Sequence, residues 1–161
     1  MSGNDPQLPQ LYLEDLTVGQ RFESATHKLD AEQIIAFARQ FDPQPFHLDA
    51  EAAKSTLFGG LAASGWHTAA LTMKLIVQST PFSRGVIGRN VVVKWPRPTR
   101  PDDVLHVESE ILSITPSQSR RDRGRVVMKS LTMTARGDVV QELEATIVVP
   151  RQPVTEAAPC V

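Results

Sequence analysis

The sequence is poor in cysteine, in net charge and in long apolar runs. Cys160 is the only cysteine among 161 residues, so no disulfide can form within the chain, and the thiol has no neighbouring cysteine or histidine with which to share a metal ion. A formal net charge of −1 gives no general attraction to nucleic acid or to an anionic membrane. No stretch approaches the roughly 20 apolar residues of a membrane span, and the polar segment Met1–Gln10 lacks the pattern of an ordinary signal peptide. We therefore expect a cytoplasmic protein that acts on a small molecule or on another protein.

The remaining composition is that of one globular domain. A hydrophobic fraction of 41% and a charged fraction of 22% are close to the averages for folded proteins. Residues 1–10 and 150–161 show no periodicity and offer little to bury, so both segments are predicted to be flexible tails. Neither a repeat nor a linker divides residues 11–149, which we predict to form a single domain.

Two long helices and one short helix are predicted in the first half of the chain. Asp30 is a good N-cap with Gln33 at the capping-box position, and residues 31–41 then carry apolar side chains at helical spacing. The prolines that follow end this helix. A short helix is expected at residues 49–55, and a second long helix is expected to begin after Ser64.

This second helix should run to about Gln78 and is apolar around most of its circumference. A helix of that kind is usually buried on nearly all sides. Everything after Pro81 is typical of strands, because apolar and polar residues alternate in several segments. A tight turn is expected at residues 136–138. Helices first and long one-faced strands afterwards predict an α+β fold, with a sheet curled around the buried helix.

The segment from Phe41 to His47 places a carboxylate and an imidazole between two predicted helices, in a loop that Pro43 and Pro45 stiffen. Five extended residues span roughly 17 Å, so Asp42 and His47 can share a ligand only if the segment bends. An imidazole titrates near neutrality, and a nearby carboxylate can complement it as acid or base. The pair is therefore a candidate for acid–base catalysis, although in isolation such a pair could equally form a turn or a cap.

The run Asp-Pro-Gln-Pro-Phe-His at 42–47 resembles the Asp-x-Asn-Pro-x-His signature of the MaoC-like, (R)-specific enoyl-CoA hydratases, which have the hot-dog fold. Flanking stretches at 11–22, 58–65 and 95–105 are similar to the same family, in the same order. The resemblance spans about residues 11–149 and implies a curled antiparallel sheet wrapped around a long central helix. The sequence departs from the family pattern at two positions. Gln44 stands where the family usually has Asn, and Ser64 stands where a His is common.

The resemblance implies a hydro-lyase that adds water to a 2-enoyl thioester, or removes it from a 3-hydroxyacyl thioester. In the family an Asp and a His hold one water, and the addition is syn. These roles fall on Asp42 and His47, with the division of the proton steps left open. The backbone N–H of Gly65, at the positive end of the central helix, would stabilise the enolate oxygen. The candidate substrate-binding residues are Gln44, Phe46, Ser64 and Trp66.

Other conspicuous residues are predicted to be structural. Ser64 is expected to cap the helix and not to act as a nucleophile. Trp95, and Trp66 despite its place beside the predicted site, are expected to pack in the core. The arginine-rich stretch 120–125 is predicted to be a solvated hairpin tip and not a contact for CoA phosphates. His67 is expected to be a packed or solvated residue of the helix and not a ligand. His27 and His106 lack a partner motif and are also expected to be structural. For Arg97 and Arg100, a solvated position and a contact with CoA phosphates both remain open.

The leading hypothesis is a homodimer or higher homo-oligomer that acts on an acyl-CoA, or on an acyl-carrier-protein thioester. It needs no metal and no cofactor, since coenzyme A is part of the substrate. Two alternatives remain. A hot-dog acyl-CoA thioesterase would direct water at the carbonyl, and a catalytically silent hot-dog protein would bind the thioester without changing it. The intact Asp/His pair favours the hydro-lyase.

Overall fold

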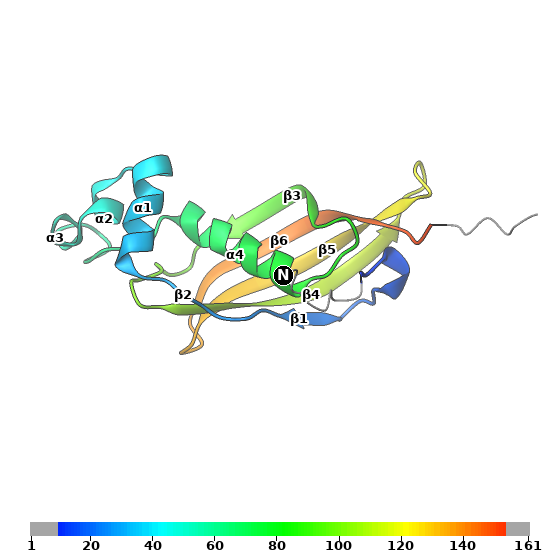
Figure 1. Ribbon diagram of the computed structural model, residues 1–161, viewed down its shortest axis with the longest axis horizontal. Helices are drawn as coiled ribbons and strands as arrows, with labels where there is room; N and C mark the ends of the chain where they lie inside the picture. The colour runs from blue at the N-terminus through cyan, green and yellow to red at the C-terminus, as the bar shows by residue number, and fades with distance from the viewer. Residues whose placement is uncertain (1–9, 154–161) are drawn as a thin grey trace, which may run out of the picture.

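The computed structural model describes residues 10–153, in which short helices come first and long strands last (Figure 1). The helical elements are η1 (Leu13–Asp15), α1 (Ala31–Phe41), α2 (Pro45–Leu48), α3 (Ala50–Ala53) and α4 (Gly65–Ser79). The strands are β1 (Arg21–Glu23), β2 (His27–Lys28), β3 (Ile87–Lys94), β4 (Val104–Pro116), β5 (Arg123–Thr134) and β6 (Val139–Pro150). Within residues 10–153, no helix has the length and apolar character needed to cross a membrane.

The strands form one antiparallel sheet in the order β1-β4-β5-β6-β3, with β2 also paired to β4. The sheet curls, and α4 runs along one of its faces, while α1, α2 and α3 gather at one end of the molecule (Figure 1). Inward-facing residues alternate with outward-facing ones along β4, β5 and β6. This is the α+β arrangement expected from the sequence.

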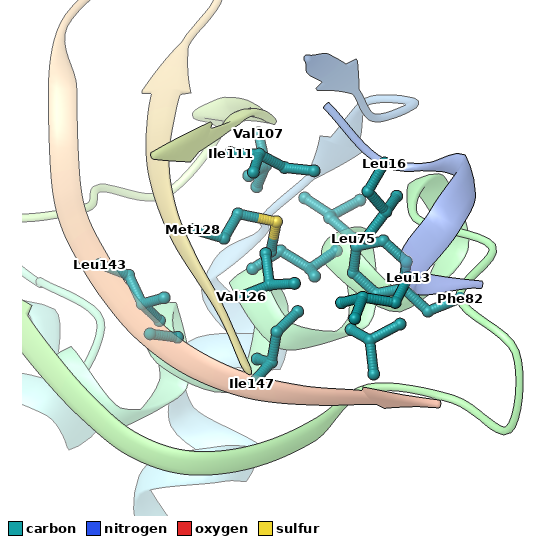
Figure 2. Close-up of a cluster of buried hydrophobic side chains, with 13 residues drawn as sticks. Leu13, Leu16, Leu75, Phe82, Val107, Ile111, Val126, Met128, Leu143 and Ile147 are labelled. Carbon is teal, nitrogen blue, oxygen red and sulfur yellow. The ribbon is translucent and has the colours of Figure 1, made fainter. Parts of the chain in front are cut away.

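The main core lies between α4 and the inner face of the sheet (Figure 2). Leu75 and Ile76 of α4 contribute to it, together with alternate residues of the long strands. A second cluster joins Ile34 of α1 to Leu71 of α4 and Leu105 of β4. This second cluster fixes α1 against the first half of α4, and the candidate catalytic residues follow directly from the end of α1.

The prediction that α4 is buried on nearly all sides is wrong for this chain. One face, which includes Leu71 and Leu75, is buried, but Trp66, Met73 and Val77 on the other face are 63%, 39% and 51% exposed. The physical reason is that the sheet of one chain covers only one side of the helix. Strand β3 lies at the edge of the sheet beside this open side and is also largely exposed.

The local signals at the helix ends are mostly confirmed. Asp30 accepts a hydrogen bond from the N–H of Gln33 at 2.8 Å, and α1 covers the predicted residues. The second half of the capping box does not form, because the Gln33 side chain bonds instead to His27, at 2.7 Å, and to the carbonyl of Lys28. Of the predicted tails, residues 1–9 and 154–161 lie outside the described residues. Arg151 donates to Glu14 at 2.6 Å, so the chain stays in contact with the domain just after β6.

Candidate active site

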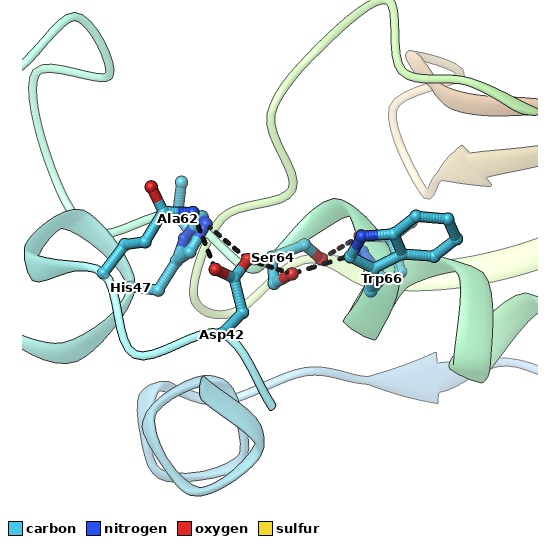
Figure 3. A network of polar contacts seen from close by, with 7 residues as sticks. Asp42, His47, Ala62, Ser64 and Trp66 are labelled. Atoms are coloured by element: carbon cyan, nitrogen blue, oxygen red, sulfur yellow. Dashed lines mark hydrogen bonds and ion pairs between the residues drawn. The ribbon is translucent and has the colours of Figure 1, made fainter. Parts of the chain in front are cut away.

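The chain bends sharply between Asp42 and His47. The N–H of Gln44 donates to the carbonyl of Asp42 at 2.8 Å, and the N–H of His47 donates to the carbonyl of Gln44 at 2.9 Å. The expected loop is therefore partly helical, because Pro45–Leu48 forms the single turn α2 with Pro45 at its first position. As a result Oδ2 of Asp42 lies 3.3 Å from Nε2 of His47 (Figure 3). The bend that a shared ligand requires is present.

The imidazole of His47 is buried and its orientation is fixed. Its Nδ1 lies 2.6 Å from the carbonyl oxygen of Ala62, and its side chain is 5% exposed. A carbonyl oxygen only accepts, so Nδ1 carries the hydrogen. In the neutral ring Nε2 then has a free lone pair, and this lone pair faces Asp42. Phe46 packs edge-on against the ring with centroids 4.6 Å apart, which makes Phe46 a support for His47.

The carboxylate of Asp42 is surrounded by donors. Ser64 Oγ donates to Oδ2 at 2.6 Å, and Gln44 Nε2 donates to Oδ1 at 2.6 Å. Burial by itself raises the pKa of Asp42, but the hydrogen bonds from Ser64 and Gln44 and the charge of His47 outweigh it, so the pKa lies below its ordinary value. Asp42 is therefore ionised at neutral pH, and its carboxylate lies beside the imidazole of His47.

Ser64 and Gly65 occupy the start of α4, as expected. The hydroxyl of Ser64 accepts from the N–H of Trp66 at 3.2 Å, so it caps the helix and holds Asp42 at the same time. Gly65 is the first residue of α4, where a backbone N–H has no partner within the helix. A Cβ at Gly65 would come within 2.8 Å of the indole of Trp95. Close packing of Trp95 therefore requires the glycine, whatever its role toward a ligand.

The two tryptophans are not core residues, which corrects the prediction. Trp66 is 63% and Trp95 41% exposed, and their rings meet edge to face with centroids 5.4 Å apart. The indole N–H of Trp95 donates to Gln141 at 2.8 Å, and Gln141 in turn donates to Thr72 at 2.9 Å. This buried relay fixes Trp95 over the start of α4. Gln141 could not be recognised from the sequence, because it stands in a strand pattern like any other polar residue.

Arg100 stabilises the segment before α4 through hydrogen bonds to its backbone. Its guanidinium donates to the carbonyls of Gly60, at 2.9 Å, Leu61, at 3.2 Å, and Phe58. The next residue, Ala62, holds His47, so Arg100 supports the imidazole indirectly. Arg97 pairs with Asp138 at the surface. Neither arginine was assigned a role from the sequence, where only their place in the similar stretch 95–105 marked them.

The remaining histidines have contacts with residues other than Asp42 and His47. His67, in the buried face of α4, stacks on Phe37 of α1 with centroids 4.5 Å apart. His27 bonds to Gln33, and His106 lies 3.7 Å from Glu108. Of the two positions expected for His67, packed or solvated, the structure shows the packed one.

Two hollows lie near the β4–β5 hairpin. In Figure 1 this hairpin is at the opposite end of the sheet from α1, α2 and α3. One, of about 730 Å³, is lined among others by Arg84, Arg121 and Arg151. The other, of about 680 Å³, is lined among others by Arg89, Arg120 and Arg125. The hairpin itself is as predicted, and Arg123 within it pairs with the neighbouring Asp122 at 2.6 Å. These hollows do not contain the candidate catalytic residues.

Comparisons with known proteins agree with this fold. The crystal structure of a MaoC-like dehydratase from Rhodospirillum rubrum is 59% identical, covers 89% of this chain and 99% of its own, and superposes with a TM-score of 0.87. An (R)-hydratase from Pseudomonas aeruginosa, in its unliganded form, is 28% identical with a TM-score of 0.72, covering 94% and 96% of the two chains. A 3-hydroxybutyryl-CoA dehydratase of Methylorubrum extorquens is 29% identical over 148 residues, which is 91% of this chain and 89% of that protein.

The neighbours show that the curled sheet and central helix form a hot-dog fold, as expected. The MaoC-like domain matches residues 15–134. The chain belongs to the MaoC-like dehydratase family, and it is an enzyme of the hydro-lyase class.

Proposed function

We propose that the protein adds water to a 2-enoyl-CoA thioester, or removes it from the 3-hydroxyacyl-CoA, with Asp42 and His47 holding and activating the water. The observation that carries the proposal is the distance of 3.3 Å between Oδ2 of Asp42 and Nε2 of His47, which face each other (Figure 3). When the imidazole is neutral, with its hydrogen on Nδ1, both of these atoms are acceptors and need a shared hydrogen-bond donor. One water that donates a hydrogen to each satisfies both.

The chemistry follows from this arrangement. The water oxygen attacks Cβ of the enoyl group while the pair removes one of its protons, and the electrons move onto the thioester carbonyl to give an enolate. A proton delivered to Cα completes the hydration, and the same steps in reverse eliminate water. We propose that the N–H of Gly65 donates to the enolate oxygen, because the first N–H groups of a helix stabilise developing negative charge.

The proposed substrate is inferred from the relatives and from the residues next to the Asp42–His47 pair. One relative is named a 3-hydroxybutyryl-CoA dehydratase and another an (R)-specific enoyl-CoA hydratase, which supports an acyl-CoA substrate here. Proton transfers suffice for this reaction, so we propose that no metal or redox cofactor takes part. Ser64 and Trp66 lie at the start of α4 and are proposed to border the thioester. A cytoplasmic location belongs to the same proposal, because acyl-CoA pools and a lone cysteine, Cys160, suit a reducing compartment.

A panel of enoyl-CoAs of graded chain length tests this function against both alternatives. Hydration removes the absorbance of the conjugated thioester and leaves the thioester bond intact. A thioesterase would instead release free thiol, and a silent binding protein would do neither. Loss of absorbance without thiol release is the expected result, and thiol release or unchanged substrate across the whole panel would contradict the proposal.

A further inference from the structure

Gln44 is joined to both candidate catalytic residues. Its side-chain amide donates to Oδ1 of Asp42 at 2.6 Å, its N–H donates to the Asp42 carbonyl, and its own carbonyl accepts from the N–H of His47. Gln44 is exposed, so burial does not account for this geometry. It was expected among the substrate-binding residues, but its amide is directed at the carboxylate.

Gln44 is also the N-cap residue of α2, yet its side chain makes no capping hydrogen bond. An N-cap side chain ordinarily accepts from a backbone N–H two or three residues later, and Asn is among the best residues for this while Gln is not. An Asn at this position would therefore be drawn toward the N–H groups of α2. The longer Gln side chain leaves them and reaches Asp42 instead.

We propose that Gln44 is a positioning residue that clamps Oδ1 of Asp42, so that Oδ2 alone faces His47 and the reacting water. This inference rests on the proposed function of the Asp42–His47 pair. With Oδ1 taken by the amide, the carboxylate cannot rotate without losing a hydrogen bond to a charged group. The amide also favours the ionised carboxylate, because it bonds to that form.

The effect of Gln44 on the ionisation of Asp42 can be measured, because few other groups contact this carboxylate. From α4 the carboxylate meets the hydroxyl of Ser64, and from α2 it meets His47, whose charge also lowers the Asp42 pKa. Among the described residues no other titratable group acts on Asp42. A change in its ionisation after substitution at position 44 can then be assigned to the lost amide, with His47 followed in parallel.

The test compares Gln44→Met and Gln44→Asn with the wild type, and uses Gln40→Met on the exposed surface of α1 as a matched control. Met keeps the length of the side chain and removes the donor, whereas Asn keeps an amide and improves the cap. The first readout is the titration of the Asp42 carboxyl carbon by ¹³C NMR in the free protein. It does not depend on whether the protein hydrates enoyl thioesters. The second readout is kcat and KM for crotonyl-CoA.

We expect Asp42 to titrate at higher pH in both Gln44 variants and as in the wild type in Gln40→Met. In both Gln44 variants kcat should fall about tenfold with little change in KM, the scale of one hydrogen bond to a charged group. Gln44→Asn should do so without loss of thermal stability. An unchanged Asp42 titration in Gln44→Met would overturn the proposal. A second result would also overturn the proposal: wild-type kinetics in Gln44→Asn, combined with a loss of both stability and rate in Gln44→Met. That result is expected if Gln44 acts only as the N-cap residue of α2.

Discussion

The imidazole of His67 is 7% exposed, and its Nδ1 has no hydrogen-bond partner among the described residues. Burial, with a smaller contribution from the charge of His27, lowers the pKa of His67 from 6.5 to about 4. The unfolded chain therefore binds a proton at a higher pH than the folded protein does. The stability that His67 contributes as a neutral ring is fully present above about pH 6.5 and is lost as the pH falls toward 4.

Replacing His67 with Leu should remove this pH dependence. Between pH 7.5 and pH 5 the free energy of unfolding of the wild type should fall by on the order of 2 kcal/mol more than that of His67→Leu. Urea unfolding at the two pH values measures the difference. His106→Gln, at a partly buried histidine beside Glu108, is the control and should follow the wild type. An equal pH dependence in wild type and His67→Leu would show that His67 is not protonated on unfolding.

At the scale of elements, the sequence predicted those with local signals and missed those that depend on distant partners. Asp30 and Ser64 marked the starts of α1 and α4 because a cap is a contact between near neighbours. Gly137, with a φ of 88°, marked the last hairpin turn for the same reason. The roles of Arg100 and Gln141 could not be predicted, because their partners lie about 40 and 69 residues away in the chain.

The same distinction applies to the candidate site. Asp42 and His47 could be named from a short motif, whereas their separation of 3.3 Å depends on the turn α2 and on a carbonyl fifteen residues after His47. The exposure of α4 was missed because an apolar helix has the same sequence pattern whether its own sheet or another molecule covers it.

The C-terminal segment after Arg151 should contribute little to the fold. Gln152 donates its N–H to Glu14 at 3.0 Å, but this contact lies at the surface beside the Arg151–Glu14 pair, which remains if the chain ends at Arg151. Deleting residues 152–161 should therefore change the free energy of unfolding by less than about 0.5 kcal/mol. Thermal denaturation of the truncated chain measures this, and a large drop in Tm would show that the segment docks.

The hairpin between β4 and β5 is expected to have little effect on catalysis. Charge reversal at Arg120, Arg121 and Arg125 should alter the salt dependence of KM only modestly, because exposed charges are screened within about 10 Å at 0.1 M salt. Arg121 lines one of the two hollows, and Arg120 and Arg125 line the other. A tenfold loss of affinity for CoA esters, with none for pantetheine esters, would instead assign the hairpin to the phosphates of coenzyme A.

On the scale of the whole molecule, an exposed sheet edge lies beside an exposed helix face. Within residues 10–153, strand β3 pairs only with β6, and Met73 and Val77 of α4 are exposed on the open side of the helix. Free strand edges and contiguous apolar faces are usually covered by another chain. We propose that a second copy of this chain covers them.

Light scattering at micromolar concentration should therefore give at least a dimeric mass. Val77→Glu should lower that mass, because it places a charge in the apolar face. Leu112→Glu, on β4 and away from the β3 edge, is the control and should leave the mass unchanged. A monomeric wild type would contradict the proposal.

The central claim is that Asp42 and His47 activate one water together. The most direct measurement is the rate of crotonyl-CoA hydration by Asp42→Asn, His47→Gln and the double variant, with circular dichroism to confirm that each is folded. Each single change should lower kcat by about 10²–10⁴, the usual contribution of a positioned acid or base. The double variant should be scarcely slower than either single, because the two groups act as a unit. A folded double variant that hydrates crotonyl-CoA at the wild-type rate would contradict the account.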